Sequence, residues 1–500
     1  MLRTQVAGAA TLKCFARVTR DRIKRVDPSL IRQSQFKRNC SSQSNSLNSG
    51  DSPLSAASPI SQEVVSIATR QKLYMIDPTS PGSVFFLPHG TRIFNKLIEF
   101  MKIQQKAFKF EEVITPLIYK HQLWKTSGHW EHYRNDMFQV FGADHSESTR
   151  ERLDSEYSHG SSYSENAEFS QYGLKPMNCP GHCLIFSRFD RTYKELPLRL
   201  SDFSPLHRNE SSGALSGLTR VRKFHQDDGH IFCTPDQVRS EMRACLTLVD
   251  TVYQVFGLTD YRLTLSTRPD SFIGSKDVWD AAEENLKESL AEIGKQWSIN
   301  PGDGAFYGPK IDVLVKDNTG KEHQLATIQL DFQLPRNFEL KYSNKDNVIE
   351  QPVMIHRAIF GSLERFFALL IDHYKGAWPF WLNPRQAAII PVAARHYDKA
   401  VQLGDLLGGT TSSLVNLQEA SALKKLSSRS FHVEVLGQDS TVGHRIRQAR
   451  DQGFSYILMI GDKELDSDTV SVKAVTEKET KVMTAPQLIT FFHELEDRYA

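Results

Sequence analysis

Four residues of the types that bind nucleotides stand on either side of a short flexible segment. Arg208 and Glu210 precede a run rich in glycine and serine (residues 211–217), and Arg220 and Phe224 follow it. Two strands joined by such a loop form a hairpin, and alternate residues of a strand share one face. The hairpin can offer a guanidinium to a phosphate, a carboxylate to an adenine amine and a ring to a base. On the first two residues alone, a surface ion pair is the simpler interpretation.

Three residues of metal-binding types lie far apart in the chain. Cys179 is the fifth residue of a Lys-Pro-Met-Asn-Cys-Pro-Gly-His run, His230 ends a Gln-Asp-Asp-Gly-His run, and His356 opens a His-Arg-Ala run. One cysteine and two histidines leave the fourth position of a tetrahedral zinc ion open, which is typical of reactive rather than structural zinc. Taken alone, such residues are more often ordinary core residues. By spacing, His182 or Cys183 could equally join a site centred on Cys179.

Periodic segments predict the elements that position these residues. Residues 91–106 place their apolar side chains on one helical face, and residues 234–256 begin with a threonine cap, a proline and a capping-box glutamine, so both segments are predicted helices. Short strand-like runs occupy 263–266, 311–315 and 324–332. Strands mixed with helices at irregular spacing predict an α+β domain built on an antiparallel sheet flanked by helices.

The pattern changes after a proline-rich segment at residues 378–384. Predicted strands and helices then alternate, which indicates a small α/β domain with a mostly parallel sheet. The predicted strands are 386–392, 431–436, 456–461 and 469–475, and the predicted helices include 441–452 and 486–498. We therefore expect one domain over residues 63–383 and a second over 384–500.

The first forty residues differ in charge from the rest of the chain. They hold ten Lys or Arg against two Asp, a net charge of +8, so residues 41–500 carry −6 of the total of +2. An Arg-rich, acid-poor start is typical of a mitochondrial transit peptide, and residues 1–62 are predicted to be that peptide and a disordered linker. A basic RNA-binding arm is the alternative. A polar tract at 142–170 is predicted to be a surface insertion, for which we assign no function.

Composition excludes several other classes of protein. The chain has no run of about 20 apolar residues, so we expect no membrane span. Six cysteines in 500 residues are too few for a disulfide scaffold. The acidic charge of residues 41–500 argues against indiscriminate nucleic-acid binding, so an RNA partner must meet local basic patches.

The hairpin pattern resembles motif 2 of the class II aminoacyl-tRNA synthetases. Residues 356–365 are similar to motif 3, and Pro116 follows a predicted helix and a predicted strand at 112–115, where motif 1 places its dimer-interface proline. The chain contains neither nucleotide-binding signature of the class I enzymes. Its nearest imitation of a phosphate-binding loop, at 302–310, has Pro309 in place of a residue with a backbone N–H.

Longer runs are similar to the threonyl-tRNA synthetases almost letter for letter. They are residues 124–130, 175–182, 198–234, 304–311, 329–332, 352–358 and 461–464. The chain is thus identified as a member of that family, in a mitochondrial form without the N-terminal editing domain. The alternatives are a prolyl or seryl class II enzyme and a non-catalytic synthetase-like tRNA-binding protein. The cysteine and two histidines argue against the first, and intact Arg208, Arg220 and Arg365 argue against the second.

The resemblance implies ATP-dependent activation of L-threonine to threonyl-adenylate and its transfer to the 3′ end of tRNA(Thr) in the mitochondrial matrix. Mg²⁺ would accompany ATP, and the enzyme would be a homodimer with no membrane association. One Zn²⁺ per chain, held by Cys179, His230 and His356, would bind the amino and hydroxyl groups of threonine and so exclude valine. Serine keeps both groups, so we expect measurable formation of seryl-tRNA.

The resemblance also implies roles for individual residues. Arg208 and Arg365 would be the catalytic residues. The residues expected to bind threonine are Asp228, Tyr307, Gln329 and Met177. Those expected to bind ATP are Arg208, Glu210, Arg220, Phe224, Gln324 and Arg365. Those expected to contact the anticodon are Arg445, Lys463 and Glu464.

Overall fold

The structure is a computed structural model, and it describes residues 62–140, 172–318, 320–410, 429–437 and 439–500. The predicted transit peptide and linker, apart from residue 62, and the predicted insertion at 142–170 lie outside the described residues. Within the described ranges, no helix is both long and apolar enough to cross a bilayer.

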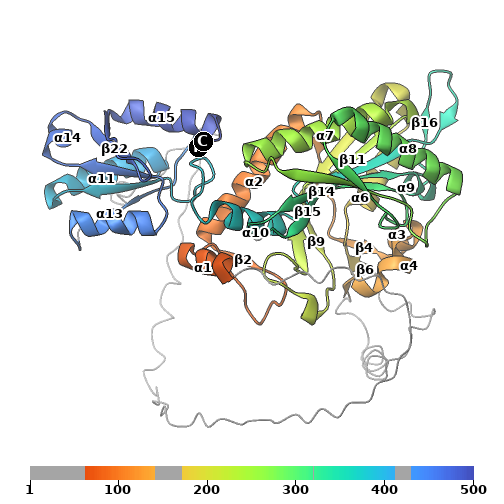
Figure 1. The fold of residues 1–500 in the computed structure, drawn as a ribbon, viewed down its shortest axis with the longest axis horizontal. Helices are drawn as coiled ribbons and strands as arrows, with labels where there is room; N and C mark the ends of the chain where they lie inside the picture. Colours follow the sequence, from red (N-terminus) through yellow and green to blue (C-terminus); the bar gives the residue numbers. More distant parts are fainter. Residues whose placement is uncertain (1–61, 141–171, 319, 411–428, 438) are drawn as a thin grey trace, which may run out of the picture. The chain divides into compact units, whose positions relative to one another are not determined.

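An eight-stranded sheet forms the centre of the first part of the chain (Figure 1). In spatial order its strands are β13 (Trp297–Asn300), β12 (Tyr261–Ser266), β14 (Lys310–Lys316), β15 (Glu322–Asp331), β18 (Val353–Ala358), β11 (Asp228–Cys233), β8 (Leu198–Asp202) and β3 (Glu111–Glu112). The six central strands pair antiparallel, while the edge strands β13 and β3 run parallel to their neighbours. The predicted antiparallel sheet is confirmed, with two parallel edge strands in addition.

Four long helices supply much of the core that covers this sheet. They are α2 (Pro88–Ala107), α7 (Val238–Val255), α8 (Lys276–Ile293) and α10 (Leu363–Tyr374). The predicted helix at 91–106 is confirmed by α2. The predicted helix at 234–256 is confirmed by α7, although its first turn is the 3₁₀ helix η4 (Pro235–Gln237), which a capping box of Thr234 and Gln237 closes.

The central strands β11 and β18 contribute side chains to two different clusters, one on each face of the sheet. Ile231 and Ile355 belong to the main apolar core with the long helices. Phe232 and Met354 belong to a smaller cluster on the other face, together with Cys179. Because alternate residues of a strand face opposite sides, one face of the sheet packs on helices and the other is available for polar groups.

Smaller elements complete the first part of the chain. A hairpin joins β9 (Pro205–His207) to β10 (Lys223–His225), as the sequence predicts. Three more small sheets pair β1 (Tyr74–Met75) with β2 (Phe85–Phe86), β6 (Tyr172–Leu174) with β4 (Ile118–Lys120) and β5 (Gln139–Val140), and β16 (Tyr342–Ser343) with β17 (Ile349–Glu350) and β7 (Arg191–Thr192). The remaining helices are α1 (Gln62–Gln71), α3 (His121–Thr126), α4 (His129–Tyr133), η1 (Arg134–Asp136), α6 (Cys179–Ser187), η2 (Tyr193–Glu195), η3 (Ser212–Ala214) and α9 (Gln333–Asn337).

A five-stranded sheet organises the described residues after 386. Its order is β20 (Val433–Val435), β19 (Ala387–Pro391), β21 (Tyr456–Ile460), β22 (Val470–Ala474) and β23 (Lys481–Met483). The four predicted strands are confirmed, but only β20, β19 and β21 are parallel, and β22 and β23 are antiparallel additions. The helices are η5 (Ala394–His396), α11 (Tyr397–Gly408), α13 (Val442–Asp451), α14 (Asp462–Asp466) and α15 (Ala485–Asp497).

The central strand of this second sheet is apolar on both faces. Ala387 and Ile389 pack with residues of α11 and α15, whereas Ala388 and Ile390 pack with residues of α13. Helices therefore cover both faces, which is why the strand is a continuous apolar run in the sequence.

Candidate active site

The register of three neighbouring strands places three of the predicted site residues in one row. Gln329 on β15 lies opposite His356 on β18, and His356 lies opposite His230 on β11. Residues directly opposite each other on paired strands share a face and lie side by side. The rings of His230 and His356 accordingly meet edge to face with their centroids 4.8 Å apart.

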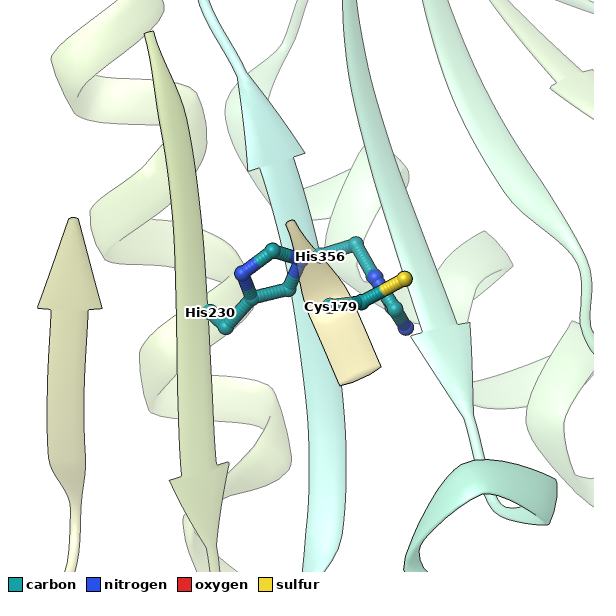
Figure 2. Close-up of side chains that lie close together, drawn as sticks. All are labelled: Cys179, His230 and His356. Carbon is teal, nitrogen blue, oxygen red and sulfur yellow. The ribbon is translucent and has the colours of Figure 1, made fainter. Parts of the chain in front are cut away.

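Cys179 reaches the two histidines from outside the sheet. It is the first residue of helix α6 and is buried, as are both histidines. Figure 2 shows the three side chains pointing toward one another, and their ligand atoms all lie within 4.8 Å of each other. Within the described part of the chain, this is the only group of three or more His, Cys, Asp or Glu side chains close enough to hold one metal ion.

The donor set fits zinc. Zinc bonds of about 2.0–2.3 Å place the ligand atoms of a tetrahedral site roughly 3.3–3.6 Å apart. The three ligand atoms therefore need to approach one another only slightly to bind one zinc ion. A thiolate and two imidazoles are the ligands that zinc prefers, and three protein ligands leave one position for a substrate. Cys183, by contrast, places its thiol 3.9 Å from the Met354 sulfur and is not a member of the cluster.

A second partner holds each histidine of the cluster. His356 Nε2 lies 2.8 Å from Oδ2 of the buried Asp331, and His230 Nδ1 lies 2.7 Å from Nδ1 of His182. One ring nitrogen of each histidine is therefore engaged, and the other is left for a metal. Metal-binding histidines generally have such a partner, which sets their tautomer and orientation.

Burial governs the protonation of this cluster in the absence of a metal. Burial, together with the carboxylates of Asp228 and Asp331, raises the pKa of the Cys179 thiol well above its ordinary value. Burial and the neighbouring rings of His182 and His356 lower the pKa of His230 well below its ordinary value. The histidine is thus neutral, as a ligand must be, whereas metal binding has to displace the proton of the thiol.

Four more predicted residues surround the cluster. The Tyr307 hydroxyl donates to Gln329 Oε1 at 2.9 Å, and the Tyr307 ring lies 5.5 Å from that of His356. Asp228 is two residues before His230 on β11, and its Oδ2 accepts from Asn178 Nδ2 at 2.8 Å. Burial raises the pKa of Asp228, whereas the hydrogen bond from Asn178 opposes the shift. The fourth residue is Met177, which packs against the smaller apolar cluster of the sheet, the one that includes the Cys179 side chain.

The predicted nucleotide-binding residues lie on and around the β9–β10 hairpin. The Arg208 guanidinium lies over the ring of the buried Phe224, with 5.0 Å between Cζ and the ring centroid. Glu210 Oε2 accepts from Arg220 Nε at 2.9 Å, so these two predicted ATP contacts are paired with each other. The hairpin thus carries two arginines, one on each side of its connecting loop.

Arg365, from α10, joins these arginines. Its Nε donates to the carbonyl of Thr219 at 3.2 Å, and its Nη1 donates to the carbonyl of Gln324 at 3.4 Å. Burial and the positive charges of Arg208 and Arg220 lower its pKa. Three guanidinium groups that repel one another in this way form a site for a polyanion such as a triphosphate. The exposed Gln324 lies beside them, and its amide donates to Asp312 at 2.6 Å.

The three predicted anticodon residues have different surroundings. Arg445 is 4% exposed and donates to the carbonyl of Pro391 at 2.7 Å, so its guanidinium is engaged inside the domain. Glu464 accepts from the backbone N–H of Gly461 at 3.0 Å and from the Ser471 hydroxyl at 2.7 Å. Lys463 has an exposed side chain.

Two residues that hold the site together carry no role predicted from the sequence. Asp331 lies two positions after Gln329 on β15, so strand alternation alone could have placed it on the face of the site. Asn178, the residue before Cys179, carries the amide that holds Asp228, and no local pattern predicts that contact.

Comparison with known proteins agrees with this arrangement. A family model described as the tRNA synthetase class II core domain (G, H, P, S and T) matches residues 163–374, and one described as an anticodon binding domain matches 386–495. The mitochondrial threonine–tRNA ligase of Saccharomyces cerevisiae is 52% identical over 446 residues, which are 87% of this chain and 91% of that protein. The probable mitochondrial threonine–tRNA ligase of Schizosaccharomyces pombe is 48% identical over 442 residues, with 86% and 88% covered.

A solved structure extends the comparison to the fold. The crystal structure described as the RNA-binding domain of threonyl-tRNA synthetase from Cryptosporidium parvum Iowa II has a TM-score of 0.74 and 38% sequence identity, and covers 86% of this chain and 98% of that one. The sheet, the hairpin and the two matched models together define a class II aminoacyl-tRNA synthetase core followed by an anticodon-binding domain. On the identity and coverage of its relatives, the chain belongs to the threonyl-tRNA synthetase family.

Proposed function

We propose that this chain activates L-threonine with ATP and transfers it to the 3′ end of tRNA(Thr) in mitochondria. The observation that carries the proposal is the buried cluster of Cys179, His230 and His356. It lies in a class II core whose relatives at 52% and 48% identity are described as a mitochondrial threonine–tRNA ligase and a probable one. The threonine carboxylate attacks the α-phosphorus of ATP and pyrophosphate leaves. The terminal ribose hydroxyl of the tRNA then attacks the adenylate carbonyl and AMP leaves.

The cluster is proposed as the zinc site that selects the amino acid. Zinc held by these three side chains would act as a Lewis acid toward the amino and hydroxyl groups of threonine, and valine has no hydroxyl group to offer it. Asp228 accepts a hydrogen bond from the hydroxyl of threonine, and Asn178 holds that carboxylate in place. Tyr307 and Gln329, joined by a hydrogen bond, orient the ammonium group, and Met177 borders the pocket.

The arginines are proposed to hold the triphosphate, with Mg²⁺ accompanying ATP. Arg208 contacts the carboxylate and the α-phosphate during attack, while Arg220 and Arg365 neutralise the leaving pyrophosphate. Phe224 stacks on adenine, Glu210 reads its amine, and Gln324 lies beside the phosphates. The pairing of Glu210 with Arg220 supports this assignment, since nucleotide binding can exchange that pair for contacts with the base and the phosphate.

The test is ATP–pyrophosphate exchange by the purified full chain, with threonine, valine, serine or proline, alongside a measurement of zinc content. We expect exchange with threonine and about one zinc per chain. Exchange with valine should be lower by roughly 10⁴-fold, because valine offers no oxygen to a site that requires one. A folded, zinc-loaded protein without threonine-dependent exchange would favour the non-catalytic tRNA-binding alternative. Exchange with proline or serine alone would mean that the pocket is misassigned.

Serine gives a separate test of the proposed metal selection. Serine has the amino and hydroxyl groups of threonine, so only its missing methyl group distinguishes it, and one methyl group gives about 10–200-fold discrimination. We therefore expect purified enzyme to form seryl-tRNA at a measurable rate. Undetectable mischarging would contradict selection by these two groups alone.

We also propose that the chain is a homodimer. Ile114, Leu117 and Ile118 flank Pro116 and are 86%, 37% and 46% exposed, so an apolar surface is available at the motif 1 segment. Sedimentation velocity should show a dimer for the full chain and a monomer for Ile114→Lys. A monomeric wild-type protein at micromolar concentration would contradict the proposal.

The domain boundaries at 63–383 and 384–500 remain our proposal, supported by the end of α10 at Tyr374 and the start of β19 at Ala387. Import into the mitochondrial matrix is supported by the mitochondrial relatives and by the basic first forty residues. Among the anticodon candidates, we propose that Lys463 contacts RNA, because its side chain is exposed. Arg445 and Glu464 instead hold the surrounding backbone.

A further inference from the structure

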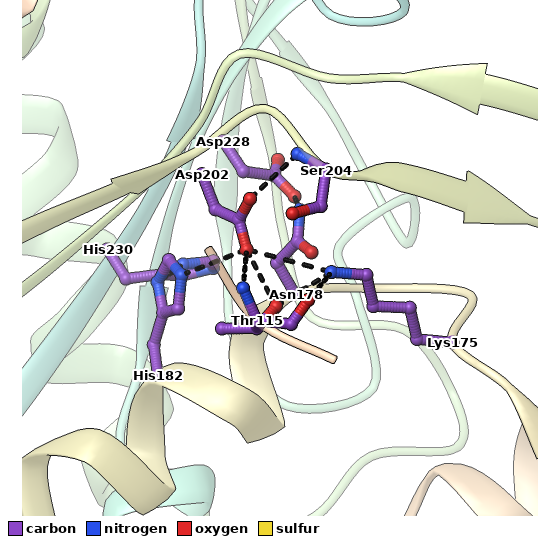
Figure 3. Close-up of polar contacts among 8 residues, drawn as sticks. All are labelled: Thr115, Lys175, Asn178, His182, Asp202, Ser204, Asp228 and His230. Carbon is purple, nitrogen blue, oxygen red and sulfur yellow. Dashed lines mark hydrogen bonds and ion pairs between the residues drawn. The ribbon is translucent and has the colours of Figure 1, made fainter. Parts of the chain in front are cut away.

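His182 lies directly behind the candidate metal site without belonging to the cluster. Its fully buried ring projects from α6, and its Nδ1 lies 2.7 Å from Nδ1 of His230. Its Nε2 faces Oδ2 of the fully buried Asp202 at 3.9 Å, which is an electrostatic contact rather than a hydrogen bond. Figure 3 shows the resulting order, from a buried carboxylate through one imidazole to a proposed metal ligand.

Several donors hold Asp202 in place. Its Oδ2 accepts from the Thr115 hydroxyl at 2.6 Å and from the Thr115 N–H at 3.2 Å, and its Oδ1 accepts from the Ser204 N–H at 2.7 Å. Lys175 Nζ lies 3.6 Å from Oδ2 and donates to the same Thr115 hydroxyl at 2.7 Å. A carboxylate with this many donors is ionised and has a single orientation.

The position of Asp202 is unfavourable for the sheet by itself. The pairing of β8 with β11 sets Asp202 directly opposite Asp228, and like charges in that relation destabilise a sheet. Lys175, fully buried, compensates for one charge, and Asn178 donates to the other. Each carboxylate of the pair thus needs its own compensating side chain, and this cost indicates that Asp202 serves something other than the stability of the strand pair.

The contact between the two histidines determines which ring nitrogens carry protons. Two Nδ1 atoms at 2.7 Å share one proton, so one ring donates and the other accepts. If His230 offers the lone pair of Nε2 to a metal, its proton is on Nδ1, and His230 must be the donor. His182 then accepts at Nδ1 and carries its own proton on Nε2, the nitrogen that faces Asp202.

We propose that Asp202 and His182 are positioning residues that hold His230 in the tautomer and orientation required of a metal ligand. The inference rests on the metal-binding role proposed above for the cluster. It predicts that either side chain can be changed without touching a ligand and still weaken the binding of zinc. A purely structural role predicts lower stability with unchanged zinc affinity.

The experiment measures zinc dissociation constants for the full chain, without substrates, by competition with a chromophoric chelator. His182→Phe keeps the ring volume and removes both nitrogens, and Asp202→Asn keeps the shape and removes the charge. Each variant should bind zinc about 10–100-fold more weakly than wild type, the usual effect of losing a partner of a metal ligand. Because Asp202 acts through His182, the double variant should be no weaker than His182→Phe alone.

Cys183→Ala is the matched control. Cys183 is adjacent to His182, equally buried on the same helix, and contacts Met354 rather than His230. It should lower the thermal midpoint of the metal-free protein and leave the zinc dissociation constant unchanged. Equal weakening of zinc binding by Cys183→Ala and His182→Phe would mean that a looser helix is the cause, and would overturn the inference.

The remaining outcomes separate this inference from the proposed function. Wild-type protein that binds no stoichiometric zinc would overturn the metal site itself. Wild-type protein that binds zinc, with a His182→Phe variant that binds it as tightly, would overturn only the positioning role. If Asp202→Asn fails to fold, the comparison of His182→Phe with Cys183→Ala still decides.

Discussion

The two large sheets of this chain use their faces differently. In the eight-stranded sheet, β11 and β18 turn Ile231 and Ile355 toward the helices and turn His230 and His356 to the other face. In the five-stranded sheet, β19 is apolar on both faces and is covered by helices on each. The first sheet can therefore hold chemistry in the middle of its strands, whereas the second can offer RNA only its loops, edges and helix surfaces.

The largest effect should follow from removing a residue of the polar face. Cys179→Ser takes away the only thiolate of the cluster, so zinc content should fall from about one per chain to nearly none. Threonine-dependent pyrophosphate exchange should fall by about 10³-fold or more, because the group that orients the substrate is lost. Metal analysis and exchange assays on the same preparation measure both. A variant with full zinc content and full pyrophosphate exchange would contradict the proposal that the polar face binds the metal and the substrate.

Next in size is the loss of the buried cation on that face. Lys175→Met leaves Asp202 opposite Asp228 without its compensating charge, so the free energy of unfolding should fall by about 3–5 kcal/mol. Urea unfolding followed by circular dichroism measures the change. Lys463→Met, at an exposed lysine of the other domain, is the control and should change it by less than about 0.5 kcal/mol. Equal losses of unfolding free energy in the two variants would contradict the view that only the first sheet depends on a buried charge.

A smaller loss should come from the two-sided core. Ile389→Ala on β19 creates a cavity between the sheet and helices α11 and α15, with an expected cost of about 3 kcal/mol. Because this sheet carries no residue of the proposed active site, threonine-dependent exchange should be unchanged while the charging of tRNA declines. Ile390→Ala, which faces the opposite cluster, should behave in the same way. Loss of exchange in either variant would contradict the separation of roles.

The smallest effect concerns acid stability of the second sheet. Burial lowers the pKa of His432, next to β20, to about 4, while an unfolded histidine has a pKa of about 6.5. Between those values the unfolded chain binds a proton that the folded chain does not, so stability falls as the pH falls. From pH 8 to pH 5 the loss should reach up to about 2 kcal/mol. Urea midpoints for wild type and His432→Gln check this, and the variant should be less sensitive to pH.

The sequence predicted the elements with strong periodicity better than the short ones. Helices α2 and α7 and four strands of the second sheet lie close to their predicted positions. The strand predicted at 112–115 is instead β3, Glu111–Glu112. Thr115 gives its N–H and its hydroxyl to the Asp202 side chain, and a side chain that competes with the ladder in this way ends a strand early. The partner is 87 positions away, so no local pattern shows it.

Some residues of the candidate site could be predicted from the sequence and others could not. Resemblance to a family predicted Cys179, His230 and His356 as ligands of one metal ion, and the structure places their ligand atoms close enough to hold one. Spacing alone left His182 and Cys183 as equal candidates, because neighbours on a short helix differ only in where their side chains point. The resemblance also implies an anticodon contact for Arg445, and no local pattern shows that this arginine is buried against the Pro391 carbonyl, because arginine is usually exposed.

The pairing of His230 with His356 also has a consequence for how the chain acquires its native state. The two strands that carry them are far apart in the sequence, so their contact closes a very long loop and belongs to the slow, non-local part of folding. A collapsed chain that has formed its helices but not this strand pair has no place for the ion. Zinc uptake during refolding should therefore lag behind the recovery of helical signal, and added zinc should slow global unfolding by binding only the completed sheet.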